Sequence, residues 1–487
     1  MSVLTTPGYQ LQPSAQQVAL ATNYITDFNF LNQYLPDTYE KEFERYGNRT
    51  VASFLRMVGA EMPSNSDLIK WAEQGRLHVK YTNCTTTVIT NSDTATFTIN
   101  DVLNPDRAAI GLTAGSIAIR VGQTVVVTPN ANPTGAATQN KAIVTAVNTG
   151  AGTIDVAFYE AAGMSNGNAG NTYSIFIYGS EFGKGTDGMQ GSLEADDEIF
   201  ENSPIILKDR YSVSGSDMAQ IGWVEVSTEN GATGYLWYLK SEHETRLRFE
   251  DYLETSMIEA VPAATGSGAV AAGYKGSEGV FYAVNNRGNV FGGGTPETLA
   301  DFDNIIKRLD KQGSIEENVL FLSRDSSFAI DDMLAEQNSY GAGGTSYGLF
   351  DNDEEMALNL GFSGFRRGYD FYKTDWKYLN DPTMRGGTDT DGVTFGSNTA
   401  SLVTGMLVPA GSTTVYDQIM GKNAKRPFLH VRYRASETED RRYKTWITGS
   451  AGGAMTSEKD AMEVHFLSER CVCTLGANNF FLFRYGA

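Results

Sequence analysis

The sequence predicts an α+β fold that contains a small inserted all-β domain. Three observations support this fold class: a long charged helical segment at 235–260, a run of short β-branched strands at 81–180, and alternating helices and strands after residue 263. The chain has 487 residues. That length suffices for roughly three domain-sized units with buried cores.

The N-terminal segment, residues 1–36, carries no charge before Asp27. It is rich in Gln, Thr, Asn and Pro and holds only isolated apolar residues, so it cannot close a core by itself. Those residues are Val3, Leu4, Tyr9, Leu11 and Val18. Two interpretations stay open: a disordered tail, and an extended arm that orders against a neighbouring subunit.

Residues 37–80 continue with a helical pattern. The stretch "DTYEKEFERYGNRTVASFLRMVGAEM" alternates Glu with Lys and Arg and places aromatic and apolar residues on one side. A second, short helix is predicted for "DLIKWAEQG", with Asn65 or Ser66 as its cap and Gly75 as its end.

Residues 81–180 differ in texture from both neighbours. Segments such as "IAIRVGQTVVVTP" and "NTYSIFIYG" alternate polar and apolar residues, charges are sparse, and turn signals recur at short spacing. This predicts a compact barrel or sandwich, inserted as a separate module. Residues 181–226 then predict an extended hairpin with glycine hinges. Its strands carry Ile205, Ile206, Leu207, Tyr211 and Val213.

The segment "YLWYLKSEHETRLRFEDYLETSMIEA", residues 235–260, predicts one helix of about 39 Å at roughly 1.5 Å per residue. Glu244–Arg248 and Glu242–Arg246 are i,i+4 pairs, each worth a few tenths of a kcal/mol. An ordinary long core helix would also explain this pattern. One stripe collects residues three or four apart: Leu236, Leu239, His243, Leu247, Glu250, Leu253 and Met257.

Helices and strands alternate after residue 263. Thr295 or Thr298 is expected to cap a helix over "LADFDNIIKRLDKQG". A short buried strand is expected at "NVLFLS" and a second helix at "SSFAIDDMLAEQNSYG". The C-terminal third returns to strands, among them "SLVTGMLVP", "RPFLHVRYRA", "MEVHFLSERCVCTLG" and "NNFFLFRYG".

The net charge of −20 argues against nucleic-acid recognition and against attachment to anionic membranes. No apolar run approaches the roughly 20 residues that cross a bilayer, and the N-terminus lacks the basic and apolar blocks of a secretion signal. Three cysteines are too few for a disulfide scaffold, and Cys471 and Cys473 project to one face of a strand, poorly placed to bridge. A reducing compartment is therefore expected.

Three glycine-rich segments resemble known catalytic or nucleotide-binding motifs, but each lacks a feature that the motif requires. Gly179–Gly185 ("GSEFGKG") lacks the spacing and the Ser or Thr of a phosphate loop. Gly266–Gly273 misses the dinucleotide-binding spacing by one residue. Gly344–Gly348 fits the pattern of a nucleophile elbow around Ser346, but no buried strand precedes it.

Metal and carboxylate sites are not completed either. The turn containing Asp389 and Asp391 lacks the bidentate Glu of a calcium loop. His465, Cys471 and Cys473 offer three ligands where a closed zinc site needs four. The glycosidase-like acids Asp351, Asp353, Glu354 and Glu355 are expected on solvated loops. We therefore predict no catalytic, cofactor-binding or metal-binding residue and no enzymatic activity.

Basic residues gather near the C-terminus, interrupted by Glu437, Glu439 and Asp440. This mixture favours an ion-pair network over a phosphate-binding surface. The basic residues are Lys422, Lys425, Arg426, Arg432, Arg434, Arg441, Arg442 and Lys444.

The order of the elements resembles the shell subunits of tailed bacteriophages with the HK97 fold. The whole chain is also similar to the major capsid proteins of crAss-like phages. Three stretches carry that similarity: the opening "MSVLTTPGYQLQPSAQQVALATNYITDFNFLNQYLPDTYEKEFERYG", the helix "YLKSEHETRLRFEDYLETSMIEA" and the closing "ERCVCTLGANNFFLFRYGA". The resemblance covers essentially the full length.

The resemblance implies an HK97-type capsid fold with an inserted small all-β domain. The implied divisions are an N-terminal arm (1–36), peripheral-domain helices with the start of the extended loop (37–80), the inserted β-rich domain (81–180), the extended-loop hairpin (181–226), the spine helix of the peripheral domain (227–262), a mainly axial α/β domain (263–425) and C-terminal strands of both domains (426–487).

The implied function is self-assembly into hexamers and pentamers of an icosahedral shell around a dsDNA genome, in a virion assembled in the host bacterial cytoplasm. Implied partners are other copies of the chain, auxiliary or head-fibre capsid proteins, a portal, and packaged DNA through weak non-specific contact, with no membrane and no cofactor. Three alternatives stay open: an encapsulin, a β-rich phage tail or surface structural protein, and a carbohydrate-active enzyme.

Overall fold

The structure is a computed structural model. It describes residues 60–86, 93–103, 110–112, 116–130, 139–161, 163, 172–191, 197–220, 226–227, 233–234, 237–339, 363–381, 383–385, 403–417, 422–453 and 455–485. The expected N-terminal arm and residues 37–59 of the helical pattern expected for 37–62 lie outside these residues. The last three residues of that pattern, 60–62, belong to strand β1 (Ala60–Ser64), so the helical prediction is wrong there. The described chain combines helices with several sheets and a small barrel, which confirms the prediction of a mixed fold at that level. Of the described helices, none combines the length and the apolar character that a membrane crossing needs.

The chain divides into two compact units. Among described residues, the smaller unit comprises Ser212–Glu244 and Gly449–Met462. It holds the short helix α2 (Gly215–Met218) and the pair β13 (Val226–Ser227) and β14 (Thr233–Gly234). Gly449 has φ 128°, and a Cβ there would lie 1.9 Å from the carbonyl oxygen of Ala461, so this tight turn requires glycine.

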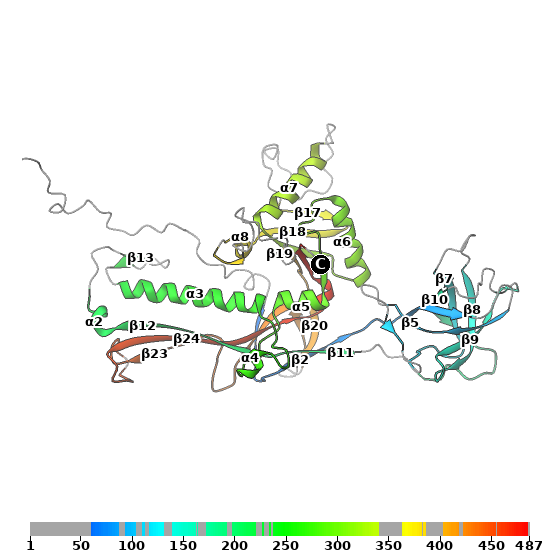
Figure 1. Cartoon of the computed structure of the whole chain (residues 1–487), viewed down its shortest axis with the longest axis horizontal. Helices are drawn as coiled ribbons and strands as arrows, with labels where there is room; N and C mark the ends of the chain where they lie inside the picture. The colour runs from blue at the N-terminus through cyan, green and yellow to red at the C-terminus, as the bar shows by residue number, and fades with distance from the viewer. Residues whose placement is uncertain are drawn as a thin grey trace, which may run out of the picture. The chain divides into compact units, whose positions relative to one another are not determined.

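One of the described sheets has five strands, among them the long strands β12 (Ile205–Ser214) and β24 (Ala461–Thr474), as Figure 1 shows. Its order is β1, β22 (Leu429–Arg434), β24 and β12, with β23 (Lys444–Gly449) also paired to β24. The long strand β24 holds the sheet together, because it pairs with three of the other four strands.

Helix α3 (Trp237–Glu259) confirms the helix predicted for 235–260. It packs on the sheet, where Phe249 stacks on Phe466 with ring centroids 5.8 Å apart. The predicted apolar stripe is right at Leu253 and Met257, which are buried, and wrong at Leu239, which is 47% exposed. Phe249 is buried because it packs between Tyr443, just before β23, and Phe466 of β24, which define the contact face.

The predicted ion pairs of α3 are replaced by others. Arg246 pairs with Glu250 at 3.6 Å. Arg248 reaches Asp209 of β12 at 3.3 Å and so ties the helix to the sheet instead of to Glu244.

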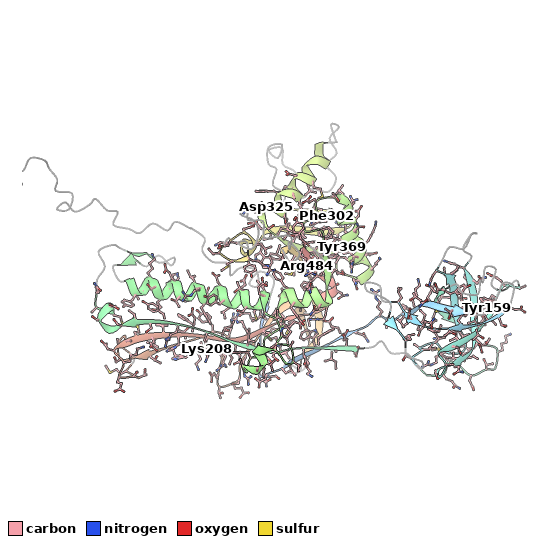
Figure 2. The ribbon with its side chains drawn as sticks, viewed as in Figure 1. Tyr159, Lys208, Phe302, Asp325, Tyr369 and Arg484 are labelled. Carbon is pink, nitrogen blue, oxygen red and sulfur yellow. The ribbon has the colours of Figure 1, made fainter. Side chains whose placement is uncertain are left out.

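A second, six-stranded sheet follows the order β15 (Asn289–Phe291), β25 (Phe481–Arg484), β19 (Val403–Pro409), β16 (Glu317–Leu322), β18 (Tyr369–Asp375) and β17 (Gly364–Arg367). Helices α6 (Leu299–Gln312) and α7 (Arg324–Ser339) fall where the sequence predicts them. Thr298 caps α6 with Asp301 in a capping box. Phe302 (Figure 2) packs edge-on against Phe365, with ring centroids 4.9 Å apart.

Several further elements among the described residues complete this part of the chain. They are α4 (Gly268–Ala271), α5 (Val280–Arg287), α8 (Lys377–Asn380), the turn η4 (Ala477–Asn479) and the hairpin of β20 (Ser412–Asp417) and β21 (Lys422–Pro427).

The described residues between 80 and 180 form an eight-stranded sheet that closes on itself, because β10 pairs with both β7 and β3. We call it the barrel. Its order is β10 (Thr172–Ser180), β7 (Gln123–Pro129), β8 (Asn140–Asn148), β9 (Thr153–Phe158), β4 (Thr94–Thr98), β3 (Lys80–Thr86), β5 (Asp101–Val102) and β6 (Ile110–Gly111). The barrel has a separate hydrophobic core, in which the ring centroids of Phe97 and Tyr173 lie 5.5 Å apart.

The helix expected for "DLIKWAEQG" is wrong. Residues Ile69–Gln74 form strand β2, which pairs antiparallel with β11 (Asp197–Asn202). Local propensity favoured a helix, but the partner strand supplies the backbone hydrogen bonds, and burial alternates with period two along β2.

The hairpin expected for 181–226 is wrong in its pairing. Strand β11 pairs with β2, whereas β12 pairs with β24 of the five-stranded sheet. Only Ser203 and Pro204 separate β11 from β12, and the chain passes there from one sheet to another instead of reversing on itself.

Candidate functional site

The two-stranded sheet of β2 and β11, here called the ribbon, leads into the barrel and returns from it. Residues alternate between its faces, so Trp71 and Glu73 of β2 share one face with Phe200 and Asn202 of β11. These four are at least partly buried, whereas Ile199 on the opposite face is 66% exposed. The covered face is where the ribbon is attached, and its root at Asn202 is the candidate site.

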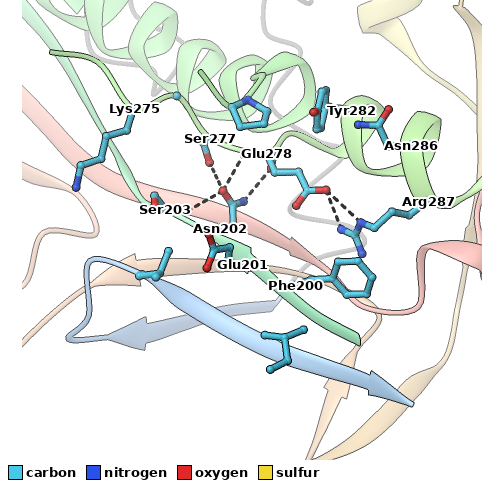
Figure 3. A pocket seen from close by; sticks show the side chains of 14 residues that line it. Phe200, Glu201, Asn202, Ser203, Lys275, Ser277, Glu278, Tyr282, Asn286 and Arg287 are labelled. Carbon is cyan, nitrogen blue, oxygen red and sulfur yellow. Dashed lines mark hydrogen bonds and ion pairs between the residues drawn. The ribbon is translucent and has the colours of Figure 1, made fainter. Parts of the chain in front are cut away.

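Asn202 fixes the end of β11 through five hydrogen bonds, of which Figure 3 shows those to Ser203, Ser277 and Glu278. Its Nδ2 donates to the carbonyl oxygens of Glu278 (2.9 Å) and Val472 (2.6 Å). Its Oδ1 accepts from the backbone N–H groups of Ser203 and Glu278 (both 2.8 Å) and from the Ser277 hydroxyl (3.0 Å). One buried amide therefore joins the ribbon, strand β24 and the start of α5.

Arg287, the last residue of α5, holds the covered face of the ribbon. Its guanidinium donates to Glu278 Oε1 at 2.8 Å and lies 3.5 Å from Glu73 Oε1. The same group lies over the rings of Phe200 and Trp71, 4.2 and 5.6 Å from their centroids. A planar cation between two carboxylates and two aromatic rings fixes the ribbon in position and in rotation.

Glu73 continues this attachment toward the C-terminus. Its Oε1 accepts from the Trp71 indole N–H at 2.9 Å and from the backbone N–H of Gly476 at 2.9 Å. Further along, the Arg76 guanidinium donates to the carbonyl oxygen of Lys311 at 2.8 Å. The strand leading to the barrel is thus held at several points.

A cavity of about 390 Å³ lies at the root of the ribbon (Figure 3). Its lining includes Ile199, Asn202, Lys275, Tyr282 and Arg287. The polar groups described above are engaged with one another. Among the described lining residues we find no hydroxyl hydrogen-bonded to a general base, which a nucleophilic site requires. The arrangement therefore has a structural role: it attaches the ribbon to α5 and β24. We call Asn202, Arg287, Glu73 and Glu278 the joint.

The sequence motifs are not brought into this joint. Gly179–Gly185 is the end of β10 followed by irregular chain, and Gly266–Gly273 spans the short helix α4. The expected loop at Gly344–Gly348 with Ser346, the acids at 351–355, and Asp389 with Asp391 lie outside the described residues.

Cys471 and Cys473 lie buried on β24, with Cys473 opposite His430 of β22. A hydrogen bond with Cys473, together with burial, raises the pKa of the Cys471 thiol. His465 precedes Cys471 by six residues of extended strand, about 20 Å, and its ring stacks on that of Trp446. Within the described parts of the chain, no group of three or more side chains is placed to hold a metal ion.

Of the C-terminal basic residues whose side chains are described, four form ion pairs, as predicted: Arg434, Arg441, Arg442 and Lys444. Arg441 pairs with Glu469 at 2.6 Å, and Lys444 with Glu439 at 2.8 Å. Arg434 also pairs with Glu469, at 3.5 Å. The side chains of Lys422, Lys425 and Arg426 lie outside the described set.

A second cavity, about 770 Å³, lies between the barrel and residues 181–191, here called the strap. The strap is held by Phe182, whose ring fills the space above Gly122, and by Glu181, whose Oε2 accepts from the Tyr159 hydroxyl at 2.5 Å.

The Tyr159 contact predicts a pH dependence. The hydrogen bond to Glu181 raises the pKa of Tyr159 to about 12. Since the raised pKa belongs to the folded state, the contact is complete below pH about 10, where a free tyrosine titrates, and is lost as the pH passes about 12. A difference absorbance titration, wild type minus Tyr159→Phe, measures this group alone. A difference midpoint near 10 would contradict the contact.

Sequence reasoning missed the joint. Asn202 and Arg287 belong to no motif. Apart from Ser203, the hydrogen-bond partners of Asn202 lie 75 to 270 residues away in the sequence, and those of Arg287 lie 9 and 214 residues away. The only local signal is period two, with Trp71 and Glu73 on one strand and Phe200 and Asn202 on the other.

Neither a protein-family model nor a curated protein matches the sequence. Solved structures show low similarity. A chain of Microbacterium phage Oxtober96 aligns at TM-score 0.37 and 8% identity, over 95% of this chain and 99% of that chain. The capsid of a native GTA particle aligns at TM-score 0.37 and 10% identity, over 96% and 100%. The SrpI encapsulin of Synechococcus elongatus PCC 7942 aligns at TM-score 0.31 and 11% identity, over 60% and 77%.

Proposed function

We propose that this chain is a major capsid protein with the HK97-type fold, from a crAss-like tailed bacteriophage, that self-assembles into hexamers and pentamers of an icosahedral shell around a dsDNA genome. The resemblance of the sequence to capsid proteins suggests this role, and the similar GTA chain belongs to the capsid of its own particle. The geometry of the ribbon is the observation that supports the proposal.

The ribbon presents surface that a single copy does not cover. Among described residues its two strands pair only with each other, so each strand keeps one open edge. An isolated two-stranded sheet is marginal in water, and open edges template further pairing. Ile199 adds an exposed apolar side chain to the outer face. A neighbouring copy that covers this face supplies what the ribbon lacks.

Assembly multiplies such modest contacts. Each subunit of a closed shell meets several identical copies, and closure makes the later contacts effectively intramolecular. The net charge of −20 suits the inner wall of a container, because packaged DNA then makes only weak, non-specific contact. The proposed further partners are a portal and auxiliary or head-fibre proteins, and the proposed site of assembly is the host bacterial cytoplasm.

Expression of the chain followed by electron microscopy tests the proposal. Wild type is expected to yield closed shells, and Ile199→Asp to reduce their yield about tenfold, because a charge desolvated in the subunit contact costs more than about 1.4 kcal/mol. The unassembled variant should keep its unfolding midpoint, since Ile199 is exposed there.

The matched control is Val270→Asp, which places the same charge at an exposed apolar position on α4. Shells from this control, with few from Ile199→Asp, assign the effect to the ribbon. Wild-type chain that stays monodisperse and monomeric under all assembly conditions would overturn the proposed function. Fibres or flat sheets would indicate a tail or surface protein instead.

A further inference from the structure

The outer face of the barrel carries three exposed aromatic side chains. Tyr159 (Figure 2), Phe176 and Tyr178 are 48, 39 and 49% exposed. With Lys80 and Lys141 we call them the aromatic patch. Neighbouring exposed aromatic side chains are typical of surfaces that bind a partner molecule.

Strand register places these residues together. Phe176 of β10 lies opposite Lys80 of β3 on one side and Val126 of β7 on the other. Val126 in turn lies opposite Lys141 of β8, and the backbone N–H of Tyr159 donates to the Lys141 carbonyl oxygen at 3.1 Å. These five residues form one row across four strands and the end of a fifth.

The row is a continuous surface. The register of β10 shifts between Ile177 and Gly179, so alternation does not place Tyr178. Its contact with the row does: the Lys141 ammonium lies 6.0 Å from the centroid of the Tyr178 ring. Val126 lies on this outer face between Phe176 and Lys141 and is only 6% exposed. The patch thus combines an apolar floor, aromatic rings and two cations, with the Glu181 carboxylate at its Tyr159 end.

Charge distinguishes the barrel from the rest of the chain. Residues 80–180 contain four basic and five acidic side chains, a net charge of −1, so the remainder carries −19 of the total −20. Few charges on the barrel oppose its approach to another protein surface, and its outer face presents aromatic side chains, which are common in interfaces. The two lysines of this row, one at its end and one within it, favour contact with an acidic surface and oppose contact with a basic one.

We propose that the aromatic patch docks on the acidic surface of a second copy of this chain, outside that copy's residues 80–180. The inference rests on the proposed function, since a shell brings copies side by side at high local concentration. Charge complementarity identifies this partner. In a shell, each barrel lies beside identical copies of the chain, and the residues of such a copy outside 80–180 carry a net charge of −19.

Zero-length crosslinking tests the docking directly. Shells assembled from equal amounts of ¹⁴N- and ¹⁵N-labelled full-length chain are treated with a carbodiimide, which joins an amine only to a carboxylate in contact with it. We expect mixed-isotope crosslinks from Lys141 or Lys80 to Asp or Glu outside residues 80–180. Nitration of Tyr178 is expected to fall about fivefold on assembly, as for a side chain buried in an interface.

A charge-reversal pair supplies the functional test. Lys141→Glu is expected to raise the protein concentration needed for assembly about tenfold, since it turns an attraction into a repulsion. The control Lys184→Glu makes the same charge change at an exposed position of the strap and is expected to stay within about twofold of wild type.

The outcomes separate the two proposals. Shells that form while Lys141 and Tyr178 react as fast as in unassembled subunits overturn the docking and leave the shell function standing; the patch then faces a different molecule or solvent. Equal effects of Lys141→Glu and Lys184→Glu overturn it too. If wild type forms no shells, the proposed function is wrong. Sedimentation then decides the docking: dimers lost only in Lys141→Glu support it, and monomers throughout overturn it.

Discussion

Replacing Asn202 with alanine is expected to lower the free energy of unfolding of the unassembled subunit by about 3–4 kcal/mol, because the buried partners of its amide lose their bonds together. Those partners include the backbone N–H and carbonyl groups of Glu278 and the carbonyl of Val472. Urea denaturation followed by tryptophan fluorescence measures the loss, since Trp71 lies on the ribbon that Asn202 holds.

The matched control is Asn148→Ala. Asn148 is exposed at the end of β8, where its Oδ1 accepts one hydrogen bond from the Ala151 backbone N–H at 3.1 Å. Water replaces that bond, so a loss of about 0.5 kcal/mol or less is expected. Similar losses from Asn202→Ala and Asn148→Ala would show that the joint does not hold the ribbon.

Asn202→Asp separates hydrogen bonding from packing. The variant keeps the shape but turns the Nδ2 donor into an acceptor that faces the carbonyl oxygens of Glu278 and Val472. A buried carboxyl in that position has a folded-state pKa above the unfolded value of about 4. The variant should therefore be closer to wild type at low pH, where its proton restores a donor, and should lose stability as the pH rises through the raised pKa. Loss independent of pH would point to packing alone.

The elements that the sequence predicts correctly are those with local causes. Helix α6 begins at Thr298 because the capping box is complete within four residues, and it ends at Gly313, which adopts φ 67°. Helix α3 persists because its 23 residues contain no Gly or Pro. The barrel follows from composition, since frequent turns and β-branched residues permit little else.

The failures concern pairing between distant segments. "DLIKWAEQG" has helical propensity, yet β2 pairs with residues more than 120 positions later, and no local rule reports that partner. The same non-locality hid the joint, because Asn202 and Arg287 acquire meaning only when α5, β24 and both ribbon strands are in place. Period two at Trp71 and Glu73 was visible but too short to outweigh the helical residues around it.

Arg287→Ala is expected to cost about 2–4 kcal/mol in the free energy of unfolding, because it leaves two partly buried carboxylates without their cation and removes the ring contacts. The Arg287 and Glu278 side chains are only 15 and 13% exposed, so water screens their pair little. Arg287→Lys keeps the charge but not the fork or the flat face over Phe200, and an intermediate loss is expected.

Arg324 offers a matched control in the same chain. It also pairs with a carboxylate, Asp375 at 2.6 Å, and also lies over a ring, that of Phe328 at 6.0 Å. Its side chain is 57% exposed, so Arg324→Ala is expected to cost less than about 1 kcal/mol. If Arg324→Ala and Arg287→Ala cost the same, burial does not strengthen the ribbon joint.

The Arg287 variants also connect the joint to assembly. A ribbon released at its root no longer presents Ile199 and its open edges in one fixed orientation, so each copy must spend ordering entropy when it meets its neighbour. Arg287→Lys, the milder variant, should therefore assemble only at higher protein concentration even at temperatures where the subunit is fully folded. Normal assembly by a folded Arg287→Lys subunit would mean that the joint serves stability alone and that the neighbouring copy orients the ribbon.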